Sequence, residues 1–255
     1  MIEFVKKDKK TGRVTFLLKN SHPGFANALR RLMIEEVPTM AIEDVEFSKN
    51  DSALYDEMLA HRLGLITLTT DLKGYEVKKA DDEVNAKNSV KLSLKAKGPC
   101  TVYAEEMKSK DPKVKPHFGK TPIVKLLKGQ ELEFEATAIL GTSRQHVKFA
   151  PCLAWYSYQP KVTVNNSSKD LEKFRAKYPP QIFNGNKIDA KLIEQNNLYE
   201  AVDGINDDII KVERDPTTFV FHIESWGQLS AQEILATAAD KLITLTEKFS
   251  EALNK

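Results

Sequence analysis

The fold of this chain is decided by residues 25–68, which read FANALRRLMIEEVPTMAIEDVEFSKNDSALYDEMLAHRLGLITL. The start of this stretch predicts an amphipathic helix, because its apolar residues recur at intervals of three and four and share one face. Arg30 and Arg31 lie away from that face. The helix ends at Val37, because the residue before Pro38 is disfavoured in the α conformation. The apolar face consists of Phe25, Leu29, Leu32 and Met33.

A strand and a second helix follow. The strand is expected over residues 40–47, and the helix over residues 53–63. Between them, residues 50–52 read NDS and offer side chains of the kind that cap a helix N-terminus. This succession of a helix, a strand and a helix is not typical of a catalytic centre, and it predicts a surface that docks other proteins.

The second helix carries Glu57 and His61 one turn apart. Such a pair is compatible with a metal site, but the sequence does not match the zinc motif HExxH and supplies no third ligand nearby. The favoured interpretation is a structural hydrogen bond or ion pair, with Arg62 beside it.

Length and charge limit the class of protein. A chain of 255 residues is long enough for one large domain or two to three small ones. It has 38 Lys and Arg against 36 Asp and Glu, a formal net charge of +2. A dedicated nucleic-acid binder is usually strongly basic, so this balance argues against that class.

The cysteines and the apolar runs indicate the cellular compartment in which the protein is expected. Cys100 and Cys152 are far apart and form no CxxC motif, so a cysteine-based metal site is a poor interpretation. Two unpaired thiols are typical of a reducing compartment, although one disulfide stays an alternative. The charged N-terminus lacks an apolar signal core, and the longest apolar runs are too short to span a membrane. We therefore expect a soluble cytoplasmic protein.

The rest of the chain reads as strands, one long loop and a small module. Residues 105–122 are rich in lysine and proline without a period, which predicts a long exposed loop. Residues 165–210 hold short helical patterns with many Asn and Asp, and Asp215-Pro216 is expected to end this module. Alternation of apolar and polar side chains predicts strands over residues 12–19, 89–96, 131–138 and 217–225.

The last segment predicts one long helix. Ser230 and Glu233 form a capping-box pattern at its start. Its apolar residues then recur by three and four over about five turns, as in a coiled-coil seam. Such a helix needs a partner outside the chain, or else both terminal helices simply cover their own sheet. The seam consists of Leu235, Ala238, Leu242, Leu245, Phe249 and Ala252.

These motifs resemble one family over essentially the whole chain. The resemblance rests on FANALRR at 25–31, Val37-Pro38-Thr39, NDSALYDEMLAHRLGLI at 50–66, DPKVKP at 111–116, PIVKLLKGQ at 122–130, and His146, Lys148 and Pro151. The family is the D subunit of archaeal DNA-directed RNA polymerase. It includes the third-largest subunit of eukaryotic RNA polymerase II and the N-terminal domain of the bacterial alpha subunit.

The resemblance implies an α+β fold in three parts. Residues 1–47 and 216–255 are expected to form a discontinuous dimerisation domain. Residues 48–160 would be an inserted, β-rich domain. Residues 161–215 would be a degenerate ferredoxin-like module.

The resemblance also implies a non-catalytic assembly function in transcription. Members pair with a smaller L-type subunit, bind the small N- and P-type subunits and dock the two large catalytic subunits. Little direct DNA contact and no membrane contact are expected. The nucleotidyltransferase activity would belong to the complex, and the sequence has no P-loop or GxSxG motif of its own.

Two sets of residues are expected to contact these partners. Arg30 and Arg31 match the arginines that dock a large subunit in this family, where a planar guanidinium can hold carbonyl or carboxylate oxygens. Their alternative role is as solvated helix charges. The face expected toward the L-type subunit comprises Phe25, Leu29, Leu32, Met33, Leu235, Leu242, Leu245 and Phe249.

Many relatives bind an iron–sulfur cluster in the third module through cysteines spaced C-x2-C-x2-C-x3-C-P. Alignment on Pro179 places Ser168, Leu171, Phe174 and Tyr178 at the four cysteine positions. Because none of them is a cysteine, the sequence predicts no cluster, no metal and no cofactor, with apolar packing in its place.

Two other classes of function stay open at this point. A ferredoxin-type redox protein would need the missing cysteines. A nucleic-acid-binding module would use the lysines of residues 105–122, but that segment also holds three acidic residues and lacks stacking aromatics apart from Phe118. A solvated loop is the favoured interpretation. These lysines are Lys108, Lys110, Lys113, Lys115 and Lys120.

Overall fold

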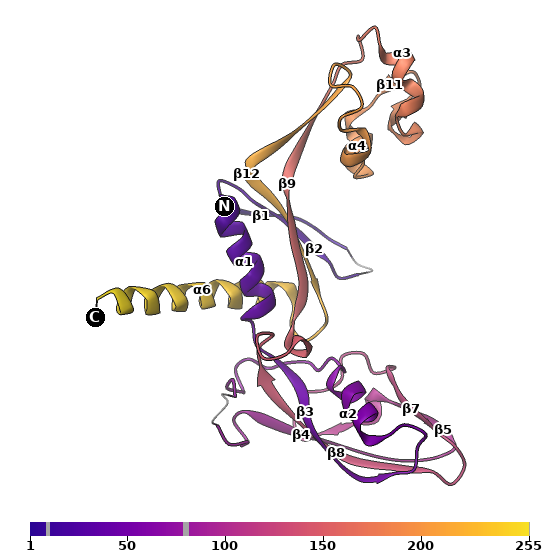
Figure 1. The fold of residues 1–255 in the computed structure, drawn as a ribbon, viewed down its shortest axis with the longest axis vertical. Coiled ribbons are helices and arrows are strands. Elements are labelled where there is room, and N and C mark those ends of the chain that lie inside the picture. The colour runs from indigo at the N-terminus through magenta and orange to yellow at the C-terminus, as the bar shows by residue number, and fades with distance from the viewer. Residues whose placement is uncertain (9–10, 79–81, 255) are drawn as a thin grey trace. The chain divides into compact units, whose positions relative to one another are not determined.

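The structure is a computed structural model that describes residues 1–8, 11–78 and 82–254 (Figure 1). These residues divide into two compact units. The first unit holds Met1–Val5, Phe16–Ala26 and Tyr156–Phe221. The second holds the described parts of Lys6–Thr15, Asn27–Trp155 and His222–Lys255. Both units are therefore assembled from segments far apart in the sequence. The fold is mixed α and β with antiparallel sheets, which agrees at this level with the α+β prediction.

One four-stranded sheet has the strand order β1-β2-β12-β9. Within the first unit, the rings of Phe16 and Phe221 stack with centroids 5.1 Å apart, and Tyr156 lies 5.1 Å from Phe221. Large aromatic side chains on neighbouring strands thus supply much of the apolar contact in this unit. The strands are β1 (Ile2–Lys7), β2 (Val14–Leu18), β9 (Cys152–Val164) and β12 (Ile210–Ser225).

The strand predicted over residues 217–225 is longer in the structure. Strand β12 begins at Ile210 and runs through Asp215 and Pro216, where the sequence pattern had suggested a turn. The Asp215 carboxylate accepts hydrogen bonds from the Thr217 N–H and hydroxyl, each 2.8 Å long. The Asp215 side chain therefore makes the short-range hydrogen bonds typical of a turn, while the backbone stays extended.

The second unit contains a four-stranded antiparallel sheet of order β3-β8-β4-β6. Phe134 lies opposite Phe47 on one side and Leu94 on the other, so the alternating positions pack into one core. The strands predicted over residues 40–47, 89–96 and 131–138 are confirmed and extend further. Their bounds are β3 (Thr39–Asn50), β4 (Ser89–Lys97), β6 (Lys108–Ser109) and β8 (Glu131–Gly141).

Helix α2 (Asp56–Gly64) and a two-stranded sheet of β5 (Cys100–Tyr103) and β7 (Pro122–Leu126) complete this core. Leu59 and Leu63 of α2 are fully buried in it. The helix starts later than predicted because Asn50 and Ser52 do not cap it. The Asn50 amide instead donates to the Leu54 carbonyl oxygen over 2.9 Å and holds a turn before the helix.

The prediction of a long exposed loop over residues 105–122 is wrong in part. Met107 and Val114 are buried, and the segment includes the short strand β6. The Thr69 hydroxyl donates to the Lys113 carbonyl oxygen over 2.6 Å, and the His117 N–H donates to the Thr67 carbonyl oxygen over 2.8 Å. Packing against residues 67–69 fixes a segment that has no period of its own. Two single-turn 3₁₀ helices in this unit are η1 (Ala104–Glu106) and η2 (Val147–Phe149).

The two predicted terminal helices are α1 (Pro23–Glu35) and α6 (Ala231–Leu253). Pro23 suits the first turn of α1, where its missing N–H is not needed. The capping box at the start of α6 is confirmed, because Ser230 accepts from the Glu233 N–H and Glu233 accepts from the Ser230 N–H. In the described part of the chain, no helix is both long and apolar enough to cross a membrane.

Residues 165–210 form a small module with its own apolar cluster. The cluster includes Ile182, Ile188, Ile193 and Val202, which come from four different elements. Short elements without a long apolar face are thus held by one shared core. They are α3 (Leu171–Phe174), η3 (Arg175–Lys177), η4 (Pro180–Ile182), β10 (Phe183–Asn184), β11 (Lys187–Ile188), α4 (Ala190–Gln195) and α5 (Tyr199–Val202).

Candidate docking surfaces

The two arginines of α1 differ in their partners. Arg31 donates two hydrogen bonds of 3.2 Å to the carboxylate of Glu35, one turn along the same helix. This bidentate pair raises the pKa of Arg31 and lowers that of Glu35. Arg30 donates instead to the neutral side-chain oxygen of Asn27, over 3.1 and 2.9 Å. The charge of Arg30 is thus the less compensated of the two.

The apolar face of α1 is mostly used inside this chain. Leu29, Leu32 and Met33 are 3%, 8% and 0% exposed, whereas Phe25 is 38% exposed. Only Phe25 of the four predicted contact residues on α1 is therefore free to add much apolar area to an interface.

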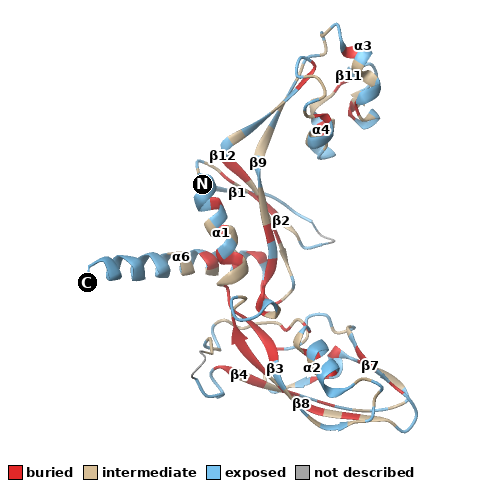
Figure 2. Ribbon diagram, in the orientation of Figure 1, coloured by how far each residue is buried: buried red, intermediate tan, exposed pale blue. Residues whose placement is uncertain are grey.

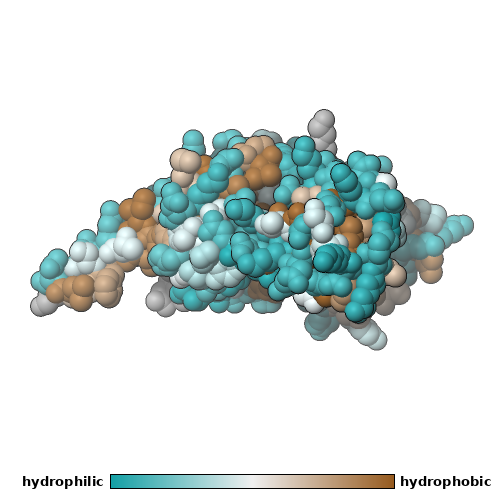
Figure 3. All heavy atoms as spheres, turned by 90° about the horizontal axis from the view of Figure 1, so that it is seen from above, coloured by the Kyte–Doolittle hydropathy of each residue, from teal (hydrophilic) through white to brown (hydrophobic). Residues whose placement is uncertain are grey.

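Helix α6 changes character along its length, as Figure 2 shows by its colour change from red and tan to pale blue. Ile234 and Ala238 in its first half are fully buried, and Leu235 and Leu242 are half-buried. Brown residues on its C-terminal part are visible at the left of Figure 3. The exposed apolar residues are Ile243, Leu245, Phe249 and Leu253, at 55%, 42%, 66% and 71%.

Leu245 and Phe249 were predicted contact residues, whereas Ile243 and Leu253 were missed. The seam was drawn at intervals of three and four, and Ile243 falls outside that series. Apolar residues on so many sides of one half-helix are unusual for a solvated helix. The C-terminal half of α6 therefore carries four large apolar side chains that the described residues leave exposed.

Arg62 of α2 has a structural role. Its Nε donates to the Ile123 carbonyl oxygen over 2.9 Å and its Nη2 to the Pro122 carbonyl oxygen over 2.8 Å. Glu57 and His61 are exposed, and the expected bond between them is not formed. In the described residues, no group of three His, Cys, Asp or Glu side chains is placed to hold a metal ion.

One face of the second unit's large sheet is covered by paired charges. Glu131 lies 2.7 Å from Lys49 and 2.8 Å from Lys97, while Lys95 lies 2.7 Å from Glu133. Hydrogen bonds from Lys49 and then Lys97 lower the pKa of Glu131 to about 2. Because these charges are already paired within the chain, we expect this face of the sheet to contact solvent rather than a protein partner.

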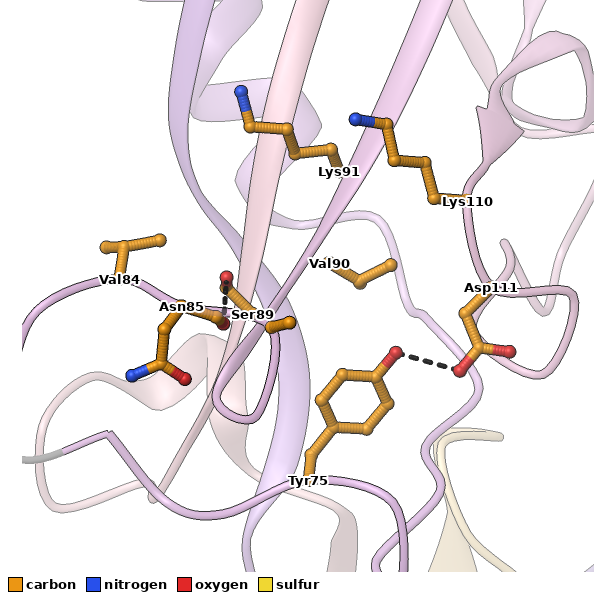
Figure 4. A pocket seen from close by; sticks show the side chains of 9 residues that line it. Tyr75, Val84, Asn85, Ser89, Val90, Lys91, Lys110 and Asp111 are labelled. Atoms are coloured by element: carbon orange, nitrogen blue, oxygen red, sulfur yellow. Dashed lines mark hydrogen bonds between the residues drawn. The ribbon is translucent and has the colours of Figure 1, made fainter.

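A pocket of about 400 Å³ lies beside β4 in the second unit (Figure 4). The Tyr75 hydroxyl donates to the Asp111 carboxylate over 2.8 Å. Burial, and then this hydrogen bond, raise the pKa of Tyr75 to about 12. Lys91 pairs with Glu135. Most polar groups of the pocket are therefore already engaged within the chain.

The four positions that were expected to align with cluster cysteines carry Ser168, Leu171, Phe174 and Tyr178 and supply no thiolate. Leu171 and Tyr178 are buried in the apolar cluster of the module, and Phe174 packs against it. Ser168 lies at its border, where its hydroxyl accepts from the Asp170 N–H over 3.3 Å. Apolar side chains occupy the place where thiolate ligands would be required.

The two thiols lie in different surroundings. Cys152 is buried in β9, and burial raises its pKa to about 12. Cys100 on β5 is partly exposed, and both are free.

Comparison with known proteins identifies the family of the chain. The model of the RNA polymerase Rpb3/Rpb11 dimerisation domain matches residues 15–246. The DNA-directed RNA polymerase subunit Rpo3 of Pyrococcus furiosus is 38% identical, with 100% of this chain and 98% of that protein aligned. Subunit Rpo3 of Thermococcus kodakarensis is 36% identical over 100% and 99% of the two chains. Subunit Rpo3 of Methanosarcina acetivorans is 36% identical, with 94% of this chain and 94% of that protein aligned. The chain belongs to the RNA polymerase Rpb3/Rpb11 family, among relatives named subunit Rpo3.

Proposed function

We propose that this protein is a non-catalytic assembly-platform subunit of DNA-directed RNA polymerase. The observation that carries the proposal is the exposed apolar half of α6 in a chain whose family is defined by a dimerisation domain. A helix with this much uncovered apolar area gains free energy when a partner removes it from water. The catalytic groups would then reside in other subunits of the polymerase.

The partner we propose for α6 is an L-type subunit. Phe25, Leu245 and Phe249 are the predicted contact residues with the most free area. Buried Leu29, Leu32 and Met33 would support the interface from inside the fold. Obligate interfaces of this type commonly bury roughly 2,000 Å² or more. We also propose the domain organisation that the family resemblance implies. Residues 1–47 and 216–255 would form the dimerisation domain, residues 48–160 an inserted β-rich domain, and residues 161–215 a degenerate ferredoxin-like module.

We propose that α1 docks a large catalytic subunit through Arg30 and Arg31. Arg31 is already paired with Glu35, so a partner carboxylate would have to share or displace that pair. Arg30 has only a neutral partner and would gain more from a new carboxylate. Replacement of either arginine by alanine should weaken large-subunit docking more than the fold. The N- and P-type subunits would bind to the same platform.

Co-expression with the L-type subunit of the same organism, followed by size-exclusion chromatography with light scattering, tests the platform. A one-to-one heterodimer should form and should be lost in Phe249→Asp or Leu245→Asp. Thr244→Asp is the matched control, because it adds the same charge at an exposed polar position of the same half-helix, away from Leu245 and Phe249. A stable monomer indifferent to the L-type subunit would refute the proposal.

We propose that the module at 161–215 works without a cofactor and keeps its shape by apolar packing. Leu171 and Tyr178 in its core support this. Purified protein should contain iron well below one atom per chain and show no visible absorbance from a cluster. Stoichiometric iron after anaerobic purification would contradict the proposal.

A further inference from the structure

Three segments of the second unit meet at one place, which we call the corner of this unit. The Leu68 and Pro116 backbones form a β-bridge beside the His117–Thr67 hydrogen bond. The Thr70 N–H donates to the Gln228 carbonyl oxygen over 3.0 Å. Residues 65–70, 116–118 and 226–228 are thus tied together although they are far apart in the sequence.

The closest contact at this corner is between Gly227 and His117. A Cβ atom on Gly227 would lie 2.2 Å from Cδ2 of His117, so the imidazole ring rests directly on the glycine. The ring in turn meets Phe118 edge to face, with centroids 4.6 Å apart. The backbone of Gly227 has φ +104°, a conformation that favours glycine and lets the ring approach.

Apolar side chains at this corner are exposed. Leu65, Phe118 and Trp226 are 55%, 56% and 42% exposed, and His117, which contacts Phe118 and Gly227, is exposed as well. We call these four residues the corner patch. Aromatic residues held on a rigid backbone are typical of the centre of a protein interface.

The backbone beneath the patch is firmly anchored. The Trp226 N–H donates to the Pro151 carbonyl oxygen over 3.0 Å, and the Gln228 side-chain amide donates to the Ala150 carbonyl oxygen over 3.1 Å. Gln228 itself is 6% exposed. A patch fixed in this way loses little conformational freedom when a partner binds.

The rim of the patch is cationic. Lys115 and Lys120 flank residues 116–118 and are exposed. Among residues 1–8, 11–78 and 82–254, neither lysine has an ion-pair partner. The Glu105 side chain lies against Gly119, so these three side chains sum to +1. The surface therefore combines apolar rings with a modest excess of positive charge.

We infer that the corner patch docks an acidic segment of another polymerase subunit, which places an apolar side chain against Phe118 and its carboxylates near Lys115 and Lys120. This inference rests on the proposed function. Charge complementarity selects the acidic partner, and the exposed rings supply the apolar contact. A nucleic acid is a poorer fit, because two lysines would neutralise few phosphates and Leu65 offers no stacking surface.

Hydroxyl-radical footprinting of the free chain and of the reconstituted polymerase tests the inference residue by residue. Oxidation of Phe118, Trp226 and Leu65 should fall about fivefold or more in the assembled enzyme, as expected for side chains at an interface centre. Exposed Leu127, at 61%, serves as an internal reference for radical dose. The footprint is taken before and after addition of DNA, so that protection by nucleic acid is recognised.

A crosslinking experiment identifies the partner. Phe118 is replaced by the photoreactive residue p-benzoylphenylalanine, and the crosslinked peptide is sequenced by mass spectrometry. An acidic segment of another subunit is the expected product. A crosslink to DNA or RNA, or to a segment without carboxylates, overturns the inference.

Charge reversal provides the third measurement. The double variant Lys115→Glu and Lys120→Glu should weaken incorporation into the polymerase by about tenfold, as for rim charges that face an acidic partner. The control is Lys125→Glu and Lys128→Glu, which reverses two exposed lysines elsewhere in the same unit. Equal incorporation of both double variants overturns the inference.

The outcomes separate this inference from the proposed function. A chain that never enters the polymerase overturns both. A chain that enters the polymerase with an unprotected corner patch overturns this inference alone and leaves the platform intact.

Discussion

Arg62 on α2 holds the backbone of β7, with its Nε 2.9 Å from the carbonyl oxygen of Ile123. A charged side chain that donates to main-chain carbonyl oxygens ties the helix to the two-stranded sheet. It therefore contributes to the fold of the second unit rather than to a free binding surface, in contrast to the arginines of α1.

Replacement of Arg62 by methionine should lower the free energy of unfolding by about 1–3 kcal/mol, because both bonds involve a charged donor. Arg31→Met is the matched comparison. It removes an exposed i, i+4 ion pair, which solvent screens, and should therefore cost much less than Arg62→Met. Urea unfolding followed by circular dichroism measures both. Equal losses in the two variants would contradict the structural role of Arg62.

Truncation along α6 should separate folding from partner binding. Ile234 is fully buried, so Ile234→Ala should cost about 2–5 kcal/mol in the isolated chain. Phe249 is 66% exposed, and Phe249→Ala should change the isolated chain by no more than about 0.5 kcal/mol. The second variant should instead weaken the heterodimer. A large loss of stability on Phe249 truncation would mean that the isolated chain already covers this residue.

The charged face of the large sheet should make stability depend on acid pH. The pKa of Glu131 lies at about 2 in the folded chain, against an ordinary value of 4.5. A lowered pKa contributes stability that is fully present above pH 4.5 and is lost as pH falls toward 2.

The melting temperatures of the protein and of Glu131→Gln, measured across this range, test the effect. The unsubstituted protein should melt higher above pH 4.5, and the difference should vanish near pH 2. Because the pair is exposed to solvent, high salt should shrink the difference at neutral pH as well. A difference that grows toward low pH would refute the assignment.

The two cysteines should differ in reactivity. Burial raises the pKa of Cys152 to about 12, and little thiolate is present at neutral or mildly alkaline pH. Iodoacetamide at about pH 8 should modify partly exposed Cys100 and spare Cys152 until the chain is unfolded by denaturant. Peptide mapping by mass spectrometry reads out both sites. Rapid alkylation of Cys152 in the folded chain would show that β9 opens.

Gly227 should tolerate no side chain. Gly227→Ala combines a strained φ of +104° with a Cβ 2.2 Å from the His117 ring. We expect the free energy of unfolding to fall by about 1–3 kcal/mol because of the backbone conformation. Displacement of the His117 ring should lower it further. Gly129→Ala is the control, because its φ is +86° but nothing lies within 4 Å of its Cβ. Equal effects would show that the His117 contact adds nothing.

Several local features followed directly from sequence. The capping box at Ser230 and the strand at residues 131–138 depend on neighbours in the chain, and both were confirmed. The absence of cysteines at residues 168, 171, 174 and 178 is likewise a property of the sequence. The family motifs lie within the range that the family model matches.

Local patterns misled where a distant segment overrode them. Residues 105–122 have no period, yet Val114 is buried because residues 67–69 bond to that segment. The Asp215-Pro216 turn signal lies inside a long strand, since the side chain of Asp215 satisfies it locally. Neither effect leaves a signature in the order of apolar and polar residues.

The sequence pattern is enough to predict which faces of the terminal helices are apolar, because helical period depends only on residues a few positions apart. It could not determine which of those faces the chain covers itself. Leu32 and Phe249 look alike in the pattern, but the first is 8% and the second 66% exposed. The corner patch likewise needs Leu65, Phe118 and Trp226 from three distant segments. Burial depends on contacts between residues remote in sequence, and these contacts exist only in the folded chain.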